Sequence, residues 1–339
     1  MNEEIPQDFF NKNLDNIIDG KGKMMDRLGF FPTSLWKPDI KITKILKKQI
    51  DDKSQVRKSL NAHRSDRRNG VNGAKPSVFN PQLAQMILAG YCKPNSKIFD
   101  AFGGGGTRGY IATKMGHDYT GVEIREEEII RIKKMFDIWG FEFKIELGDS
   151  RKYTPQRDYY DFAFTCPPYY DLEQYSNING DLSNYKTYDE FLIELEKVII
   201  NNNIGLKKDS LSVWVVGNFR DRKGNLKHLN GDLIRLAEKN GFKLWDEIIW
   251  QGASNVALTR CGKFEVNRKS VRMHEYVIIL KKVYETIPND ALHEKCKLSV
   301  DGKCKGNFSP LDCNGIDTPK EYRSELSNYW EKRYKVNKH

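Results

Sequence analysis

The sequence predicts an α/β fold built around a mostly parallel, seven-stranded sheet with an antiparallel pair of strands at one edge. Three observations support this. From residue 76 onward, short apolar runs alternate with longer amphipathic stretches, and glycine- or proline-containing turns separate them. The last two apolar runs have no helical pattern between them. Strands that alternate with helices form βαβ units, whose parallel sheet is covered by helices on both faces.

The expected elements follow in chain order. Asn80-Pro81 opens the first helix, in which Leu83, Met86 and Ile87 recur at helical spacing. Further helices are expected at 108–115, 126–139, 188–201 and 231–240. Strands are expected at 98–102, 119–123, 143–147, 162–165, 212–216, 244–250 and 276–280.

Composition limits the class of protein. The 339 residues carry a formal net charge of +10, which favours a polyanionic partner. Hydrophobic residues make up 39% of the chain, enough for a sizeable core. The chain contains no run of about 18 apolar residues, so no membrane span is expected. The acidic start of the chain does not resemble a secretory signal, and six widely spaced cysteines do not suggest a disulfide framework. A cytoplasmic location is therefore expected.

Three regions are expected along the chain. Residues 1–74 form a basic N-terminal extension, residues 75–283 the α/β domain, and residues 284–339 a polar tail. Residues 41–69 contain ten Lys or Arg residues and three Asp residues. This segment is either a solvated helix with a linker or an arm on a phosphate backbone, where each cation displaces a condensed counterion.

A glycine-rich turn, Asp100-Ala-Phe-Gly-Gly-Gly-Gly-Thr107, lies between a strand and a helix. Glycines let the backbone turn sharply and approach a ligand closely, but such a turn alone can hold a dinucleotide, a nucleoside or nothing. No Gly-Lys-Ser/Thr closes it, so it is not a P-loop. Glu123 ends the next strand, where a carboxylate can accept from ribose hydroxyls, and Asp149 follows the third strand, within reach of an adenine amino group. Either acid alone is as well explained as an exposed strand-end carboxylate, but together they predict an adenosine ligand.

A second motif, Thr165-Cys-Pro-Pro-Tyr169, follows the fourth strand and therefore lies at the same sheet edge. Its two prolines stiffen the backbone and carry no N–H, so the preceding carbonyl can accept a hydrogen bond from a ligand. Tyr169 offers a flat ring for stacking on a base. A Pro-Pro turn can be purely structural, but its place beside the glycine turn favours a binding role.

With these motifs, the chain resembles the amino-group DNA methyltransferases, which use S-adenosylmethionine (SAM) to methylate adenine N6 or cytosine N4. The glycine turn resembles their cofactor loop, and residues 165–169 resemble their catalytic (Asp/Asn/Ser)-Pro-Pro-(Tyr/Phe) motif. Residues 78–83 resemble the segment that packs on the methionine end of the cofactor, and residues 274–282 the closing edge strand. The matches span residues 75–282, about 60% of the chain. More narrowly, residues 171–176, 181–184 and 216–221 resemble phage and prophage members.

The resemblance implies a Rossmann-like SAM-dependent methyltransferase fold, SAM as cofactor, no metal, and double-stranded DNA as partner. The target base is expected to be flipped out of the duplex and stacked on Tyr169, with Tyr170 as a second candidate. The expected catalytic residues are Cys166, Pro167, Pro168 and Tyr169. The expected cofactor-binding residues are Phe79, Asn80, Asp100, Phe102, Gly103, Gly105, Thr107, Glu123 and Asp149.

Cys166 departs from the family pattern, which has Asp, Asn or Ser at this position. In the family this side chain accepts a hydrogen bond from the target amino group, and a thiol is a weak acceptor. Three alternatives remain: amino methylation, cytosine-C5 methylation with Cys166 as nucleophile, and a fold with weakened catalysis. A nucleophilic cysteine needs help to ionise, and the sequence identifies no base for it.

Basic loops outside the sheet are the candidate DNA contacts, with ordinary solvated charge as the alternative explanation. They comprise the turn at 220–227 and a candidate recognition loop at 252–272, in addition to the N-terminal extension. The candidate residues are Arg67, Arg68, Arg220, Arg222, Arg260, Lys263, Arg268, Lys269 and Arg272. Two rivals to a DNA methyltransferase are a non-catalytic nucleic-acid-binding module and an RNA or protein methyltransferase. Cys296, Cys304 and Cys313 contain no CxxC pair, so zinc is not expected.

Overall fold

The chain divides into two compact units, Met1–Glu285 and Thr286–His339. A computed structural model describes residues 32–50, 79–170, 178, 180–221, 223–252, 261, 264–283, 299–300 and 303–304. In the second unit, the described residues form one antiparallel pair, β11 (Ser299–Val300) with β12 (Lys303–Cys304). In the part of the chain described here, no helix is both long and apolar enough to cross a membrane.

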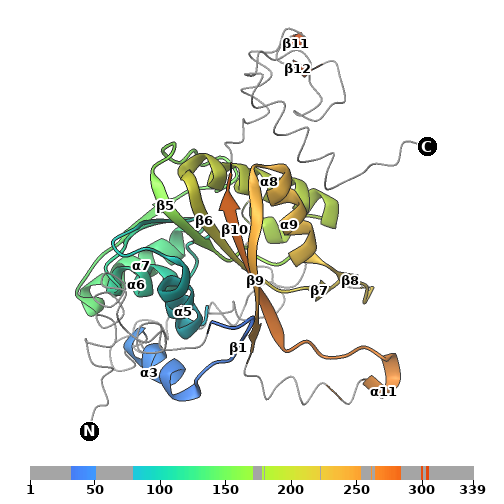
Figure 1. Ribbon diagram of the computed structural model, residues 1–339, viewed down its shortest axis with the longest axis horizontal. Helices are drawn as coiled ribbons and strands as arrows, with labels where there is room; N and C mark the ends of the chain where they lie inside the picture. Colours follow the sequence, from blue (N-terminus) through green and yellow to red (C-terminus); the bar gives the residue numbers. More distant parts are fainter. Residues whose placement is uncertain are drawn as a thin grey trace. The chain divides into compact units, whose positions relative to one another are not determined.

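The first unit is organised around one eight-stranded sheet (Figure 1). Its order is β1-β9-β10-β6-β5-β2-β3-β4, and only β10 runs antiparallel to its neighbours. The predicted α/β, mostly parallel fold is confirmed. The strands are β1 (Leu35–Trp36), β2 (Lys97–Asp100), β3 (Asp118–Glu123), β4 (Lys144–Leu147), β5 (Tyr160–Thr165), β6 (Leu206–Val216), β9 (Phe242–Gln251) and β10 (His274–Lys282).

Helices cover both faces of this sheet. Figure 1 shows α5 (Pro81–Tyr91), α6 (Thr107–Lys114) and α7 (Glu126–Trp139) on one side, and α8 (Tyr188–Gly205) and α9 (Leu229–Lys239) on the other. Successive strand residues enter the two cores alternately: Ile98 and Val213 pack in the first core, Phe99 and Trp214 in the second. Because both strand faces are buried, these strands appear in the sequence as continuous apolar runs.

The N-terminal region differs from the expected separate extension. The structure adds an eighth strand, β1, which pairs in parallel with β9, so the predicted antiparallel pair is not the outermost pair of the sheet. Trp36 of this strand is 2% exposed and belongs to the first core. Burial of the Trp36 side chain explains why this segment covers the β9 edge, which would otherwise offer unpaired backbone groups.

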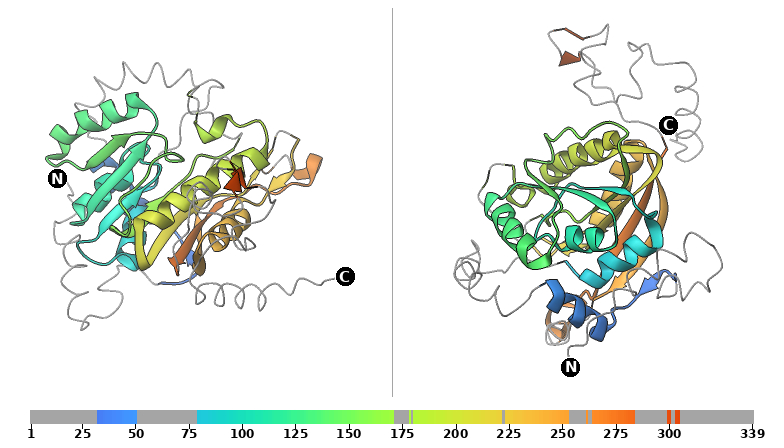
Figure 2. Two further views of the ribbon diagram at one scale, coloured as in Figure 1. Left: turned by 90° about the horizontal axis from the view of Figure 1, so that it is seen from above. Right: turned by 90° about the vertical axis from the view of Figure 1, so that its left-hand side faces the viewer.

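Helix α3 (Ile40–Ile50) also belongs to the α/β unit and lies against α5 (Figure 2). Its Leu46 is fully buried in the first core. The Thr43 hydroxyl and the Asp39 backbone N–H donate to Gln82 Oε1 at 2.7 and 2.8 Å. Residues 35–50 are therefore packed on the domain, whereas residues 51–78, with most of the basic segment, lie outside the described residues.

The start of α5 is defined by a local cap that also shapes the site. The Asn80 side chain accepts hydrogen bonds from the Gln82 and Leu83 backbone N–H groups at 2.9 and 3.2 Å. Pro81 occupies the first helical turn, where its missing N–H costs nothing. The cap holds the preceding Phe79 at the mouth of the cavity described below.

Candidate active site

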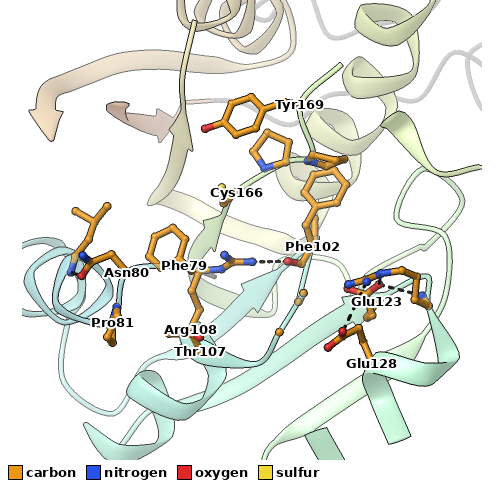
Figure 3. Close-up of a pocket in the computed structure, with 18 of the residues that line it drawn as sticks. Phe79, Asn80, Pro81, Phe102, Thr107, Arg108, Glu123, Glu128, Cys166 and Tyr169 are labelled. Atoms are coloured by element: carbon orange, nitrogen blue, oxygen red, sulfur yellow. Dashed lines mark hydrogen bonds and ion pairs between the residues drawn. The ribbon is translucent and has the colours of Figure 1, made fainter. Parts of the chain in front are cut away.

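A cavity of about 760 Å³ lies at the carboxyl ends of the parallel strands (Figure 3). Its wall combines the glycine turn, the Cys-Pro-Pro-Tyr loop, the start of α5 and the helix α3. In open α/β sheets, this edge is where ligands bind. All but one of the expected site residues line it, namely Phe79, Asn80, Phe102, Gly103, Gly105, Thr107, Glu123, Asp149, Cys166, Pro167, Pro168 and Tyr169.

Asp100 is the exception, because it lies in the core and not in the cavity wall. Its side chain is fully buried and accepts hydrogen bonds from four neighbouring residues. The donors are Tyr119 Oη at 2.6 Å, Arg108 Nε at 2.7 Å, Thr165 Oγ1 at 2.8 Å and the Phe102 backbone N–H at 3.0 Å. Asp100 therefore does not lie where the expected direct contact with the cofactor would require; instead it holds wall residues such as Phe102 and Arg108 in place.

Arg108 is a wall residue that sequence analysis missed. Its guanidinium lies 4.9 Å from the Phe79 ring centroid, donates to the Phe102 carbonyl and faces Cys166 (Figure 3). Burial alone would lower the pKa of Arg108, but the charge of Asp100, with smaller contributions from Tyr119 and Cys166, raises it above its ordinary value. The sequence did contain a clue to the role of Arg108, because it lies in the first turn of α6. The helix dipole disfavours a cation at that position unless an acidic side chain pairs with it.

Glu123 begins a chain of alternating charges at the end of the cavity beside the glycine turn, which we call the cofactor end because the sequence predicts SAM there. Its Oε1 accepts from Arg125 N and Nε, both at 3.0 Å, while no described residue donates to Oε2. Arg125 also lies 3.7 Å from Glu128, which accepts from Arg131 at 2.7 Å, and Arg131 Nη2 donates to the Gly105 carbonyl at 2.6 Å. Burial raises the pKa of Glu123, although Arg125 opposes this. These contacts tie α7 to the glycine turn and leave one carboxylate oxygen for a ligand.

Asp149 is held by a second arginine. Arg151 Nη2 and Nε donate to its carboxylate at 2.6 and 2.9 Å, and Arg151 Nη1 reaches Glu194 at 2.7 Å. Burial would raise the pKa of Asp149, but the bonds from Arg151 outweigh it and hold that pKa below its ordinary value. Gly180, at φ +116°, packs so closely that a Cβ there would lie 2.9 Å from Asp149 Oδ2. Asp149 is thus an ionised acceptor in a rigid setting.

The Cys-Pro-Pro-Tyr loop places Tyr169 at the opposite end of the cavity. The Tyr169 hydroxyl donates to Glu275 Oε1 at 3.0 Å, and a Cβ on Gly217 would lie 3.3 Å from Tyr169 Oη. Glu275, at the start of β10, lines the cavity and was not singled out from the sequence. Tyr170 is 8% exposed, packs in the second core and donates to the Lys186 carbonyl at 2.8 Å. Its burial argues against the expectation that Tyr170 stacks on a base.

The described DNA-contact candidates lie near the start of β10. Arg220 ends β7 (Phe219–Arg220), and Lys269 and Arg272 precede β10. Arg268 is exposed and pairs with Glu265 at 3.2 Å. Outside the described residues lie Arg67, Arg68, Arg222, Arg260 and Lys263.

The site combines a mostly parallel sheet covered on both faces, a glycine turn after β2, an acid at the end of β3, another after β4, and a Pro-Pro loop after β5. This arrangement is that of a SAM-dependent methyltransferase. A family model described as DNA methylase, N6_N4_Mtase, matches residues 10–134 and 160–339. The chain belongs to this family, which implies SAM as the methyl donor. The cytosine-C5 alternative is not favoured by this membership.

Solved structures with the same class of fold are distant in sequence. TrmN from Thermus thermophilus is 16% identical, with 64% of this chain and 53% of that chain covered and a TM-score of 0.42. The chain thus spans about half the length of TrmN. A SAM-dependent methyltransferase from Methanosarcina mazei is 15% identical, with 59% and 98% covered and a TM-score of 0.42. The PH0226 protein from Pyrococcus horikoshii is 13% identical, with 72% and 100% covered and a TM-score of 0.40. No curated protein matches the sequence.

Proposed function

We propose that this chain methylates the exocyclic amino group of adenine (N6) or cytosine (N4) in a base flipped out of double-stranded DNA. The observation that carries the proposal is that Glu123 and Asp149 share one cavity with Cys166 and Tyr169. Acceptors for a nucleoside and a loop for a planar base therefore open into the same space. A methyl donor held by Glu123 and Asp149 and a base held by the Tyr169 loop would therefore lie next to each other in one cavity.

The cofactor end fits SAM, which supplies an electrophilic methyl group when bound. Glu123 Oε2 would accept from a ribose hydroxyl, and the ionised Asp149 from the adenine amino group. Gly103 and Gly105 let the backbone approach the ligand without a side chain in between. Phe79, held by the Asn80 cap, would pack on the methionine end.

The base end would hold the target by stacking and by hydrogen bonding. Tyr169 would stack on the extruded base, with its hydroxyl held by Glu275. The Cys166 backbone carbonyl, which precedes two prolines, would accept one N–H of the target amino group. This bond would direct the nitrogen lone pair toward the methyl group, so that the N–C bond would form as the S–C bond breaks and leaves S-adenosylhomocysteine. The amino group would then release its other proton to solvent. The Cys166 thiol would add little as an acceptor, so the main-chain carbonyl would carry most of this role.

The catalytic domain of this proposal extends over residues 75–283 and also includes residues 35–50. Support comes from α3, whose Ile40, Thr43, Lys44 and Lys47 line the cavity. Residues 284–339 remain a separate tail in this proposal, consistent with the division of the chain after Glu285.

The experiment that tests the proposal is incubation of the full chain with labelled SAM and duplex DNA, followed by digestion to nucleosides and mass analysis. We expect N6-methyladenine or N4-methylcytosine, and the product identifies the base. Label in 5-methylcytosine would contradict amino methylation. Label in RNA or protein but not DNA would contradict the DNA substrate. If SAM binds and no acceptor is labelled, the chain is a non-catalytic binding module.

A further inference from the structure

Three cations from two segments of the chain are neighbours: Arg220 and Lys269 share a hydrogen-bond acceptor, and Arg272 interacts electrostatically with Arg220 and Tyr169. Arg220 ends β7, whereas Lys269 and Arg272 immediately precede β10. Arg220 Nη1 and Lys269 Nζ both donate to the Gly224 carbonyl, at 3.3 and 2.9 Å. Gly224 has φ +82°, a left-handed turn that favours glycine and aims this carbonyl at both cations. The turn therefore holds Arg220 and Lys269 together, and Arg272 interacts electrostatically with Arg220. We call these three residues the Arg220–Arg272 cluster (Arg220, Lys269 and Arg272).

The cluster lacks an acidic partner within the described part of the chain. None of its members forms an ion pair there, and the neighbouring Asp221 is turned to Asn225 N at 2.9 Å and Lys227 at 3.7 Å. The Nη1 atom of Arg272 is buried and has no hydrogen-bond partner among the described residues. A buried N–H of a charged group is costly to leave unpaired, so an external acceptor would stabilise this arrangement.

The electrostatic surroundings of Arg272 agree with this geometry. Burial lowers the pKa of Arg272, and the positive charge of Arg220 lowers it further. The neighbouring Tyr276 and Tyr169 raise the pKa of Arg272, but their effect is smaller. Burial and the charge of Arg272 also lower the pKa of His274. Two guanidinium groups thus repel each other at a position where an anion with several acceptor atoms would relieve the repulsion.

We propose that Arg220 and Arg272, with Lys269 as a third cation, bind one phosphodiester of the DNA strand that carries the target base. The cluster is close to Tyr169, yet none of its members lines the cavity assigned to SAM. A phosphodiester offers several oxygens to paired guanidinium groups, which match it in shape and charge. This inference rests on the proposed function, because it takes Tyr169 as the site of the flipped base.

The test is duplex-DNA affinity of the full chain as a function of salt, for Arg220→Gln, Arg272→Gln and the double variant. We expect each single variant to bind about tenfold more weakly, and the slope of log affinity against log salt to flatten by about 0.9. The double variant should flatten it by little more than either single variant, because both residues hold the same phosphate. Arg235→Gln is the matched control, since that exposed arginine on α9 pairs with Asp232 at 3.0 Å.

The outcomes separate this inference from the proposed function. Wild-type affinity and slope in both single variants, or an equal loss in Arg235→Gln, would overturn the phosphate site. A double variant that flattens the slope by two units would show two independent contacts and overturn the shared phosphate. SAM affinity should be unchanged in every variant and therefore serves as the test of folding. If Arg272→Gln does not fold, the DNA affinity and salt slope of Arg220→Gln alone test the phosphate site. Loss of DNA binding in a chain that labels no base would support the phosphate site while contradicting the enzyme.

Discussion

The arginines at the cofactor end of the cavity and the cations near Tyr169 differ in whether they have acidic partners. At the cofactor end every arginine discussed above has a carboxylate partner: Arg108 with Asp100, Arg125 with Glu123, Arg131 with Glu128, and Arg151 with Asp149. Outside the cavity, near Tyr169, the Arg220–Arg272 cluster has no such partner among the described residues. Paired charges fix the positions of side chains before a small ligand arrives, whereas unpaired cations leave their partner to be supplied by a polyanion.

This difference predicts separate responses to substitution. Changes at the cofactor end should alter SAM affinity and leave DNA affinity intact, and changes at or near Tyr169 should do the reverse. Removing one member of a buried pair also leaves the other charged and unsatisfied, which costs stability. The predictions below compare the two regions, from the largest expected effect to the smallest.

Gly105→Leu should abolish detectable SAM binding while the protein stays folded and still binds DNA. A Cβ at Gly105 would meet only Arg131 Nη2, at 3.3 Å, so the turn itself tolerates a side chain. Calorimetry with SAM and a thermal melt test this. Gly103→Leu is the contrasting variant, because its Cβ would lie 2.8 Å from Ile145 Cδ1 and 3.3 Å from the Val122 carbonyl, so it should unfold the domain. Wild-type SAM affinity in Gly105→Leu would refute the assignment of the cofactor end.

Tyr169→Ala should lower kcat/KM for DNA by about 5- to 150-fold, the equivalent of about 1–3 kcal/mol of stacking. SAM affinity should not change, because Tyr169 lies at the other end of the cavity. Tyr169→Phe keeps the ring and loses the hydroxyl that donates to Glu275, so most activity should remain. If the Phe variant were as impaired as the Ala variant, the hydroxyl and not the ring would be the essential group.

Glu123→Gln should weaken SAM binding by about 1–3 kcal/mol, as expected when a charged acceptor is lost. The pH dependence is a second readout. Burial raises the pKa of Glu123, so acidification protonates the carboxylate at a higher pH than usual and removes the acceptor for ribose. SAM affinity of the wild type should therefore fall as pH is lowered through that raised pKa, and the Gln variant should lack this component. Identical pH profiles for both proteins would exclude Glu123 as the titrating group.

Cys166→Ser should change activity least, retaining or raising it, because a hydroxyl is a better acceptor than a thiol. Cytosine-C5 chemistry would instead require a cysteine thiolate, and the same substitution would remove essentially all turnover. Methyl transfer by the Ser variant is the measurement, with a duplex containing 5-fluorocytosine as an independent trap. A folded, inactive Ser variant together with a covalent adduct of the wild type on that duplex would contradict amino methylation.

The placement of Glu123 and Asp149 in one cavity wall was largely predictable from the sequence. Glu123 ends one strand and Asp149 follows the next, and the carboxyl ends of parallel strands meet at one sheet edge, so their shared cavity follows from strand order. Asp100 sits at an equivalent strand end, yet its side chain turns into the core. What differs is the presence of Tyr119, Thr165 and Arg108 around it, and those contacts join segments far apart in the chain.

The sequence by itself determined the order and type of the elements and the residues at the two loops, because periodicity, glycine turns and proline loops act over a few neighbouring residues. Tertiary structure alone decided which charges are satisfied. It placed α3 and β1 on the domain, paired Arg108 with Asp100, and brought Arg220 within reach of Arg272. The energy of a charge depends on which groups surround it in space. Those neighbours come from different strands and loops, so no local sequence pattern predicts them.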